Sequence, residues 1–270
     1  MPEISTKVSP SVFYRKMGSG PVAVLLHGFP ESGTLWQNIW DDLSQSFTLI
    51  IPDFPGSGKS VLVQDTSIAD MATCVKEIMD HEGIKSAVIA GHSMGGYVGF
   101  AFAALYPERL KGLSLIHSTP EADDAEKIKT RQKSIELIRK GAKNTFITHM
   151  IPNLFSESFN LSKPLVVKGQ IEEGLKMDDG GMINFYNAMI ARRGNTDVLG
   201  DAVFPMQWIV GKDDNVIHYK KILELCYKSC INFVSFYRNC GHMSMIEMPE
   251  KLTEDLNIFI NYSYSINTTN

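Results

Sequence analysis

One serine in this sequence has the neighbours that nucleophilic acyl chemistry requires. The pentapeptide Gly91-His92-Ser93-Met94-Gly95 follows an apolar run directly and precedes a segment rich in small residues. A sharp strand-to-helix turn of this composition projects a serine hydroxyl above the edge of a sheet. A serine hydroxyl is a weak nucleophile at neutral pH. It therefore needs a base to take its proton and a third group to orient that base.

Two other predicted strand ends offer the base and the orienting acid. His242 lies in "NCGHMSMIEMPE", between the last predicted strand and the final predicted helix. Of the seven histidines it is the best candidate, because His81 and His149 fall in helical segments and His92 adjoins the serine. Asp213 and Asp214 follow the run "WIVGK". Adjacent residues at a strand end point in different directions, so we expect only one of these two carboxylates to reach the histidine.

The elements that must position these side chains alternate along the chain. Short apolar runs predict strands over 22–28, 47–53, 86–92, 110–118, 206–213 and 231–238. Helical patterns lie between them, near 34–45, 67–82, 94–106, 219–228 and 249–260. This alternation predicts an α/β fold with a doubly wound, mostly parallel sheet, and an early pair within 7–20 is expected to add antiparallel edge strands. Open sheets of this kind gather their sites at the carboxyl ends of the strands.

The alternation stops between 120 and 202, where the pattern predicts several short helices and no strand. We therefore expect a core built from 1–119 and 203–270, with 120–202 inserted as a helical cap. The apolar residues of this stretch are rich in methionine and phenylalanine, which suit a pliable apolar pocket as well as ordinary packing. The candidate substrate-contacting residues are Phe146, Met150, Phe185 and Met189.

Composition excludes several classes of partner. A net charge of −4 and a pI near 6.0 give no basic footprint for nucleic acid. No stretch approaches the ~18 apolar residues of a membrane span, and the first residues show no secretory signal core, so we expect a cytoplasmic protein. The four cysteines are expected to be free thiols. One pair at i, i+4, Cys226 and Cys230, is a poor metal site, so we expect neither metal nor cofactor.

The stretch "DFPGSGKS" over 53–60 resembles the end of a phosphate-binding loop. The full pattern, G-x-x-x-x-G-K-[ST], needs its first glycine where Asp53 stands. A carboxylate there would face phosphate oxygens, and Pro55 lacks the amide that such a loop offers an anion. We therefore expect no nucleotide binding.

Taken together, these motifs resemble the α/β-hydrolase superfamily, in the branch with a helical cap after the sixth strand. The resemblance is carried by "LLHGFPES", "DFPGSGKS", "GHSMGG", "GKDDNVI" and "GHMSMIEMPE". It implies that "DFPGSGKS" is the family's D-x-x-G-x-G-x-S turn, with Lys59 on the surface. It also implies an oxyanion hole formed by the backbone N–H groups of Phe29 and Met94, with His27 shaping that loop.

The family spacing G-x-x-D, counted from Gly211, selects Asp214 as the acid and leaves Asp213 solvated. Some relatives place the acid after the sixth strand instead, which keeps Glu121, Asp123 and Asp124 open as alternatives.

A serine rather than an aspartate at position 93 argues for acyl transfer and against dehalogenation or epoxide hydrolysis. The segment "FYNAMIARRGNTDVLGDAVFPMQWIVGKDD" also resembles a stretch in small carboxylesterases, enol-lactonases and cofactor-free perhydrolases, although "RRGNTD" departs from their more usual arginine-proline pattern. This resemblance implies a serine hydrolase that cleaves a small carboxylic ester or lactone through an acyl-enzyme. Two alternatives remain open. One is hydrolysis of a carbon–carbon bond in a ring-fission diketone by the same triad. The other is a ligand-binding member of the fold without catalysis. The oligomeric state is not indicated by the sequence.

Overall fold

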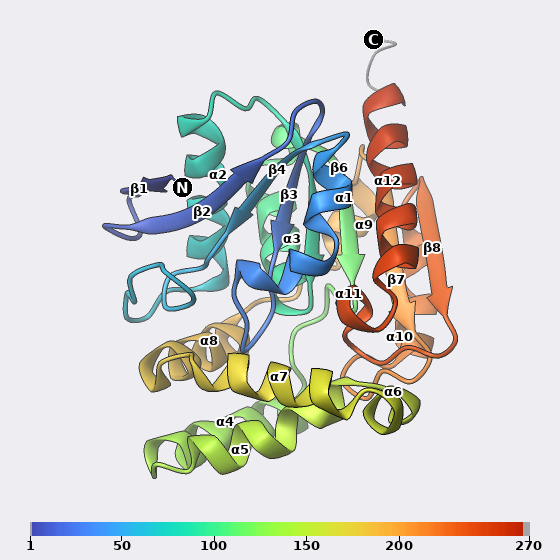
Figure 1. Ribbon diagram of the computed structural model, residues 1–270. Helices are drawn as coiled ribbons and strands as arrows, with labels where there is room; N and C mark the ends of the chain where they lie inside the picture. The colour runs from blue at the N-terminus through green and yellow to red at the C-terminus, as the bar shows by residue number, and fades with distance from the viewer. Residues whose placement is uncertain (1, 267–270) are drawn as a thin grey trace.

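The computed structural model describes residues 2–266, which are built around an eight-stranded sheet (Figure 1). From one edge to the other the strands are β1 (Glu3–Ile4), β2 (Val12–Met17), β4 (Thr48–Pro52), β3 (Val22–Leu26), β5 (Ala87–His92), β6 (Leu110–Ile116), β7 (Met206–Gly211) and β8 (Asn232–Tyr237). The pairs from β4 to β8 are parallel, whereas β1 and β2 are antiparallel. The predicted sheet is confirmed, although the first edge strand begins before the stretch in which it was expected.

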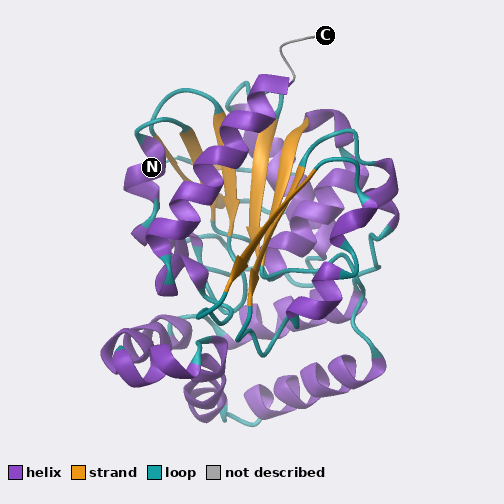
Figure 2. Ribbon diagram, turned by 90° about the vertical axis from the view of Figure 1, so that its right-hand side faces the viewer, coloured by secondary structure: helices purple, strands orange, loops and turns teal. Residues whose placement is uncertain are grey.

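Helices cover both faces of this sheet, as Figure 2 shows. Helices α1 (Trp40–Ser44) and α12 (Pro249–Ser265) pack on one face, and α2 (Ile68–His81) and α3 (Met94–Leu105) pack together on the other. Burial on both faces explains why β5 and β7 consist only of buried residues. The predicted helices near 67–82, 94–106 and 249–260 are therefore confirmed.

The remaining core helices are short. The stretch predicted as one helix near 34–45 is the 3-10 turn η1 (Gly33–Asn38) followed by α1. The stretch near 219–228 is α10 (Tyr219–Leu223) followed by η4 (Cys226–Lys228). Two further short elements are η2 (Pro107–Arg109) after α3 and α11 (Ser244–Glu247) before α12. Within residues 2–266, no helix combines the length and the apolar character needed to cross a membrane.

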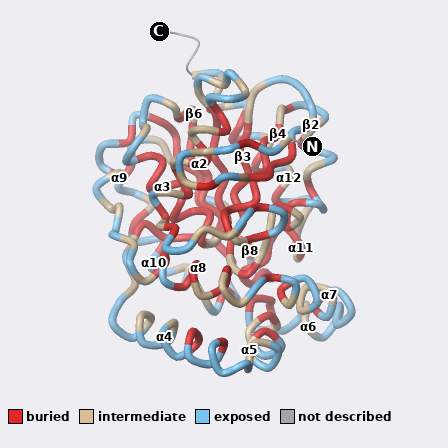
Figure 3. Tube along the Cα trace, turned by 90° about the vertical axis from the view of Figure 1, so that its left-hand side faces the viewer, coloured by how far each residue is buried: buried red, intermediate tan, exposed pale blue. Residues whose placement is uncertain are grey.

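The chain between β6 and β7 is helical, as the sequence predicts. It forms α4 (Ala125–Arg139), α5 (Lys143–Met150), η3 (Ile151–Leu154), α6 (Glu157–Ser162), α7 (Pro164–Leu175), α8 (Asp179–Ala191) and α9 (Asp197–Asp201). Helices α4 to α8 lie beyond the carboxyl ends of the strands in Figure 1, whereas α9 packs against α3. The buried residues gather around the sheet, and α4 and α5 are largely exposed (Figure 3).

The loop "DFPGSGKS" is organised around its own carboxylate. Asp53 is fully buried and accepts hydrogen bonds from the backbone N–H groups of Gly33 (2.8 Å) and Lys59 (2.9 Å) and from Nη1 of Arg15 (3.0 Å). Gly58 has φ +52°, and a Cβ there would collide with the Asp53 carboxylate. The Lys59 amide, which a phosphate-binding loop would offer to its anion, is therefore directed at a carboxylate of the same loop.

Candidate active site

Ser93 occupies a strained turn between β5 and α3. Its backbone has φ 50° and ψ −112°, an unusual conformation for a residue that is not glycine. The turn is held by its N–H, which donates to the Ile116 carbonyl (2.9 Å), and by its carbonyl, which accepts from Ser118 Oγ (2.8 Å). A Cβ at Gly95 would collide with the Leu26 carbonyl, so glycine lets α3 begin directly against the end of β3. Ser93 itself stays partly exposed among buried neighbours.

Asp214, not Asp213, lies beside His242. Nδ1 of His242 is 2.8 Å from Oδ2 of Asp214, and both residues are buried. A carboxylate only accepts hydrogen bonds, so the imidazole proton sits on Nδ1 and the Nε2 lone pair is free to act as a base. Asp213 is exposed. The loop of His242 is held in turn by its N–H, which donates to the Leu154 carbonyl (2.6 Å).

Four donors keep the Asp214 carboxylate ionised. Oδ1 accepts from the backbone N–H groups of Val216 (2.8 Å) and Ile217 (2.9 Å), and Oδ2 accepts from two imidazoles. Burial raises the pKa of this carboxyl group, but electrostatic attraction to His242 and the hydrogen bonds from His117 and His242 outweigh burial, so the pKa is lowered.

The second imidazole belongs to His117, which sequence reasoning did not single out. Its Nδ1 is 3.2 Å from the same Oδ2 of Asp214. The residue is fully buried, has φ 52°, and its Nε2 has no hydrogen-bond partner among the described residues. Burial lowers the pKa of His117 to about 4, although the hydrogen bond to Asp214 opposes the shift. The available signal was its position at the carboxyl end of the strand that pairs with β7.

The loop after β3 presents unused donors beside the elbow. Neither the N–H of Phe29 nor that of Met94 donates a hydrogen bond to another residue in the range 2–266. Met94 is the first residue of α3, where an N–H lacks an intrahelical partner. Both groups thus remain candidates to donate to an oxyanion, and the positive end of α3 favours negative charge there.

A side-chain bridge ties three loops of the site together. Oε2 of Glu31 accepts from the Gly28 N–H (3.0 Å) and lies 3.1 Å from Nδ1 of His92. Nε2 of His92 donates to the carbonyl of His242 (2.9 Å), and the two imidazole rings are 4.9 Å apart. The loop of Phe29, the elbow and the histidine loop are therefore connected through Glu31 and His92.

His27 has the structural position that the resemblance implies. Its Nε2 accepts from the Phe54 N–H (3.1 Å) and is 3.0 Å from Ser57 Oγ, which leaves Nδ1 to donate to the Gly28 carbonyl (2.8 Å). Burial lowers the pKa of this imidazole. Its hydrogen bonds are directed to loop groups rather than to a reacting atom.

The four predicted cap residues fall into two groups. Phe185 and Met189 of α8 are buried, and the ring of Phe185 lies 6.3 Å from that of His27. Phe146 and Met150 of α5 are half-buried and line a shallow groove of about 400 Å³ that includes neither Ser93 nor His242. Tyr186 lies between Phe146 and the loop after β3, because its ring is 6.2 Å from that of Phe146 and 4.4 Å from that of Phe29.

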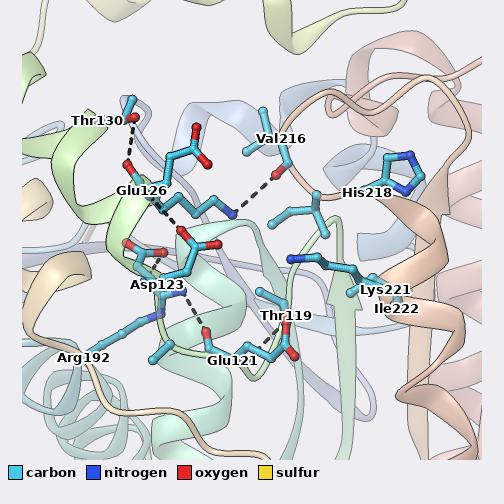
Figure 4. A pocket seen from close by; sticks show the side chains of 14 residues that line it. Thr119, Glu121, Asp123, Glu126, Thr130, Arg192, Val216, His218, Lys221 and Ile222 are labelled. Carbon is cyan, nitrogen blue, oxygen red and sulfur yellow. Dashed lines mark hydrogen bonds and ion pairs between the residues drawn. The ribbon is translucent and has the colours of Figure 1, made fainter.

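The carboxylates after β6 have other partners. Asp123 forms ion pairs with Arg131 (2.6 Å) and Arg192 (2.9 Å), and the Arg192 guanidinium stacks over the Tyr97 ring. Asp124 caps α4 through the Lys127 N–H (2.8 Å). The Glu121 side chain lines a pocket of about 540 Å³ outside the triad, shown with Asp123 and Arg192 in Figure 4. None of the three is placed to replace Asp214.

Among the described residues, one group of side chains is close enough for a shared metal ion: His117, Asp214 and His242, whose ligand atoms lie within 4.8 Å of one another. Both histidines direct Nδ1 at a single carboxylate oxygen at hydrogen-bonding distance. Metal binding would require a lone pair on each of these nitrogens, whereas the observed contacts require a proton on each. The arrangement fits hydrogen bonding to a carboxylate.

Comparisons with known proteins agree on the fold. The alpha/beta hydrolase fold model matches residues 21–249. A thermophilic esterase from Thermogutta terrifontis is 27% identical, with a TM-score of 0.92 over 97% of this chain and 98% of that chain. An enol-lactonase from Burkholderia xenovorans LB400 is 20% identical, with a TM-score of 0.88 over 96% of this chain and 100% of that one. At this lower identity, the likeness shows the fold alone.

Among sequence relatives, a pimeloyl-[acyl-carrier protein] methyl ester esterase from Wigglesworthia glossinidia brevipalpis is 35% identical over 109 residues, which are 40% of this chain and 40% of that protein. An uncharacterised protein from Mycobacterium bovis is 36% identical over 104 residues, or 38% of this chain and 30% of that protein. The chain thus spans well under half the length of the curated relatives that it matches.

Proposed function

Since the chain belongs to the alpha/beta hydrolase fold family, we propose that it is a serine hydrolase that cleaves a small carboxylic ester or lactone through an acyl-enzyme intermediate. The proposal is carried by two observations: Ser93 occupies a strained turn, and His242 and Asp214 form a buried pair whose loop accepts a hydrogen bond from His92, the residue before Ser93. Strain of this kind persists only where the surrounding structure over-determines it, and it clusters at functional sites.

In the proposed reaction, Ser93 attacks the substrate carbonyl while Nε2 of His242 accepts its proton. Asp214 holds the imidazole tautomer and stabilises the imidazolium that forms. The N–H groups of Phe29 and Met94 bind the oxyanion of the tetrahedral intermediate. His242 then protonates the leaving group and activates a water molecule that hydrolyses the acyl-enzyme.

The substrate class is supported by the names of similar proteins. The Thermogutta terrifontis protein is an esterase, and the Wigglesworthia glossinidia protein is a methyl ester esterase. Each of these names describes the cleavage of an acyl–oxygen bond. Phe185 and Met189 of α8 are the proposed contacts for the apolar part of a small substrate, with Phe146 and Met150 more distant. We propose residues 120–202 as the cap that carries them.

The proposal also includes a cytoplasmic location, which the four free cysteines support, because disulfides are rare in that compartment.

The test is covalent labelling of the nucleophile. A serine-directed phosphonate should add one adduct mass to the peptide that contains Ser93, and Ser93→Ala should abolish both labelling and ester hydrolysis. Ser46→Ala, a change at an exposed serine remote from the elbow, serves as the matched control. Near wild-type hydrolysis by Ser93→Ala would refute the assignment.

A substrate panel tests the reaction class. Short p-nitrophenyl esters, lactones and ring-fission diketones should be assayed in parallel, with turnover expected on an ester or a lactone. Turnover of the diketone alone would replace acyl–oxygen cleavage with carbon–carbon hydrolysis. Saturable binding without turnover, together with an unlabelled Ser93, would indicate a ligand-binding protein.

A further inference from the structure

We propose that His117 is a positioning residue that sets the basicity of His242 by donating a second hydrogen bond to the oxygen of Asp214 that His242 uses. The inference rests on the proposed function, since it concerns the same triad. The two imidazoles approach one atom: Nδ1 of His242 lies 2.8 Å and Nδ1 of His117 3.2 Å from Oδ2.

The protonation state of His117 follows from its surroundings. The Asp214 carboxylate is ionised and can only accept, so Nδ1 of His117 carries a proton. Burial lowers the pKa of His117 to about 4, so the ring is neutral near pH 7 and its Nε2 is an unprotonated acceptor. His117 therefore acts as a neutral hydrogen-bond donor to Asp214 at neutral pH.

Two features of His117 are costly in a residue that only fills space. Its Nε2 is buried without a hydrogen-bond partner among residues 2–266. A hydrocarbon side chain would avoid the free-energy cost of burying an unpaired polar atom. Its backbone has φ 52°, a conformation that L-residues seldom adopt. In this turn the His117 N–H donates to the Ile209 carbonyl of β7 (3.0 Å), which fixes the residue against the strand that leads to Asp214.

The expected effect has a definite sign. The His117 N–H withdraws charge from Oδ2, so Asp214 stabilises the imidazolium form of His242 less than an unshared carboxylate would. Removal of the donor should favour the imidazolium. The acid limb of the pH–kcat/KM profile, below which the base is protonated, should then move to higher pH.

Other ionisable groups lie near the rings of His117 and His242. His92 faces both rings, at 4.9 Å from His242 and 6.2 Å from His117, and it is paired with Glu31. Cys240 and Glu247 lie on the other side of the histidine loop. Burial, and to a smaller extent the charge of Glu247, raises the pKa of the Cys240 thiol far above its usual range. These groups are the same in the wild type and in the His117 variants, so a difference between them reports the loss of the His117 Nδ1–H.

Three variants separate the donor from packing. His117→Asn tolerates positive φ and can offer an amide N–H near the position of Nδ1. His117→Gly relaxes the turn without a donor, and His117→Leu fills the space without a donor. His149→Asn, at an exposed cap histidine, is the control for the chemical change. We expect the acid limb to rise by about 0.5–1 unit in the Gly and Leu variants and to stay near the wild-type position in the Asn variant.

A second readout does not depend on turnover. The ring titration of His242 can be followed by NMR of protein with labelled histidine, with its signal identified by its loss in His242→Gln. The midpoint should shift by the same amount and in the same direction as the acid limb. An unshifted His242 titration in both donor-free variants, or an equal shift in His117→Asn, would overturn the inference. An inactive wild type with an unlabelled Ser93 would instead refute the proposed function, and the NMR comparison would still test His117.

Discussion

Replacing Asp214 by asparagine tests the geometry of the site more directly than any other single change. The carboxylate accepts four hydrogen bonds, two on each oxygen, from Val216, Ile217, His117 and His242. An asparagine has one oxygen, so its NH₂ group must face two of these four donors. If it faces the imidazoles, His242 must move its proton to Nε2 and can no longer act as a base. If it faces the backbone, the two N–H groups lose their acceptor, and the charge that stabilises the imidazolium is lost in either case.

The magnitudes follow from this count. The loss of the correct tautomer and of the charge should lower kcat by up to about ten-thousandfold, or roughly 5.5 kcal/mol of transition-state stabilisation. Two buried donors without an acceptor should lower the free energy of unfolding by about 2–6 kcal/mol. We therefore expect a destabilised but folded variant if the wild-type stability lies in the usual range of about 5–15 kcal/mol.

The neighbouring residue supplies the matched control. Asp213 is exposed, and its N–H donates to the Cys240 carbonyl (3.0 Å) through the backbone, which asparagine preserves. Asp213→Asn should change kcat by less than about tenfold. The assay is kcat for both variants on one good ester, with urea unfolding of each. A severe loss of kcat in Asp213→Asn with a mild loss in Asp214→Asn would reverse the assignment. Mild losses of kcat in both variants would mean that the acid of the triad does not lie after β7.

Three further predictions concern other parts of the molecule. The pKa of His117 is about 4 in the folded protein and near 6.5 when unfolded, so only the unfolded chain gains this proton as pH falls through this window. Between pH 7 and 4.5 the unfolding free energy of the wild type should fall by about 2–3 kcal/mol more than that of His117→Asn, and parallel urea-derived curves would contradict this. Lys59→Ala should leave ester hydrolysis intact, and ATP should not bind the wild type in calorimetry, because Asp53 occupies the loop; saturable ATP binding lost in Lys59→Ala would refute that interpretation. Phe185→Ala should shift the preference among ester chain lengths several-fold in relative kcat/KM, since each added methylene is worth about 0.8 kcal/mol; an unchanged ratio in a folded variant would leave Phe185 only its packing role.

The sheet and the places of Ser93, Asp214 and His242 could be predicted because each depends on local information. An apolar run followed by a turn marks the carboxyl end of a strand, and parallel strands bring those ends to one edge. The choice between Asp213 and Asp214 depended on a family spacing rather than on physics, because both follow the same strand.

The place of His117 could not be predicted in the same way. Its contact with Asp214 requires β6 to pair with β7 in a register that puts Ile116 beside Ile209, although about ninety residues separate the two strands. No pattern within either segment specifies that register. Which cap side chains face inward could not be predicted either. Helices α5 and α8 contain apolar residues on several faces, and the contacts between helices decide which of these residues are buried.

The bridge between Glu31 and His92 has an electrical consequence. Nε2 of His92 donates to a carbonyl, so the contact between Nδ1 and the Glu31 carboxyl group must hold one proton, on the nitrogen or on the oxygen. In the first case an imidazolium faces a carboxylate, and in the second a neutral ring faces a carboxylic acid. Either distribution leaves the pair with zero net charge. The bridge can therefore hold the loops of Phe29 and His242 in place without adding a net charge to the site. The charges that develop on Ser93 and its substrate during the proposed reaction are then not opposed or favoured by a net charge on the bridge.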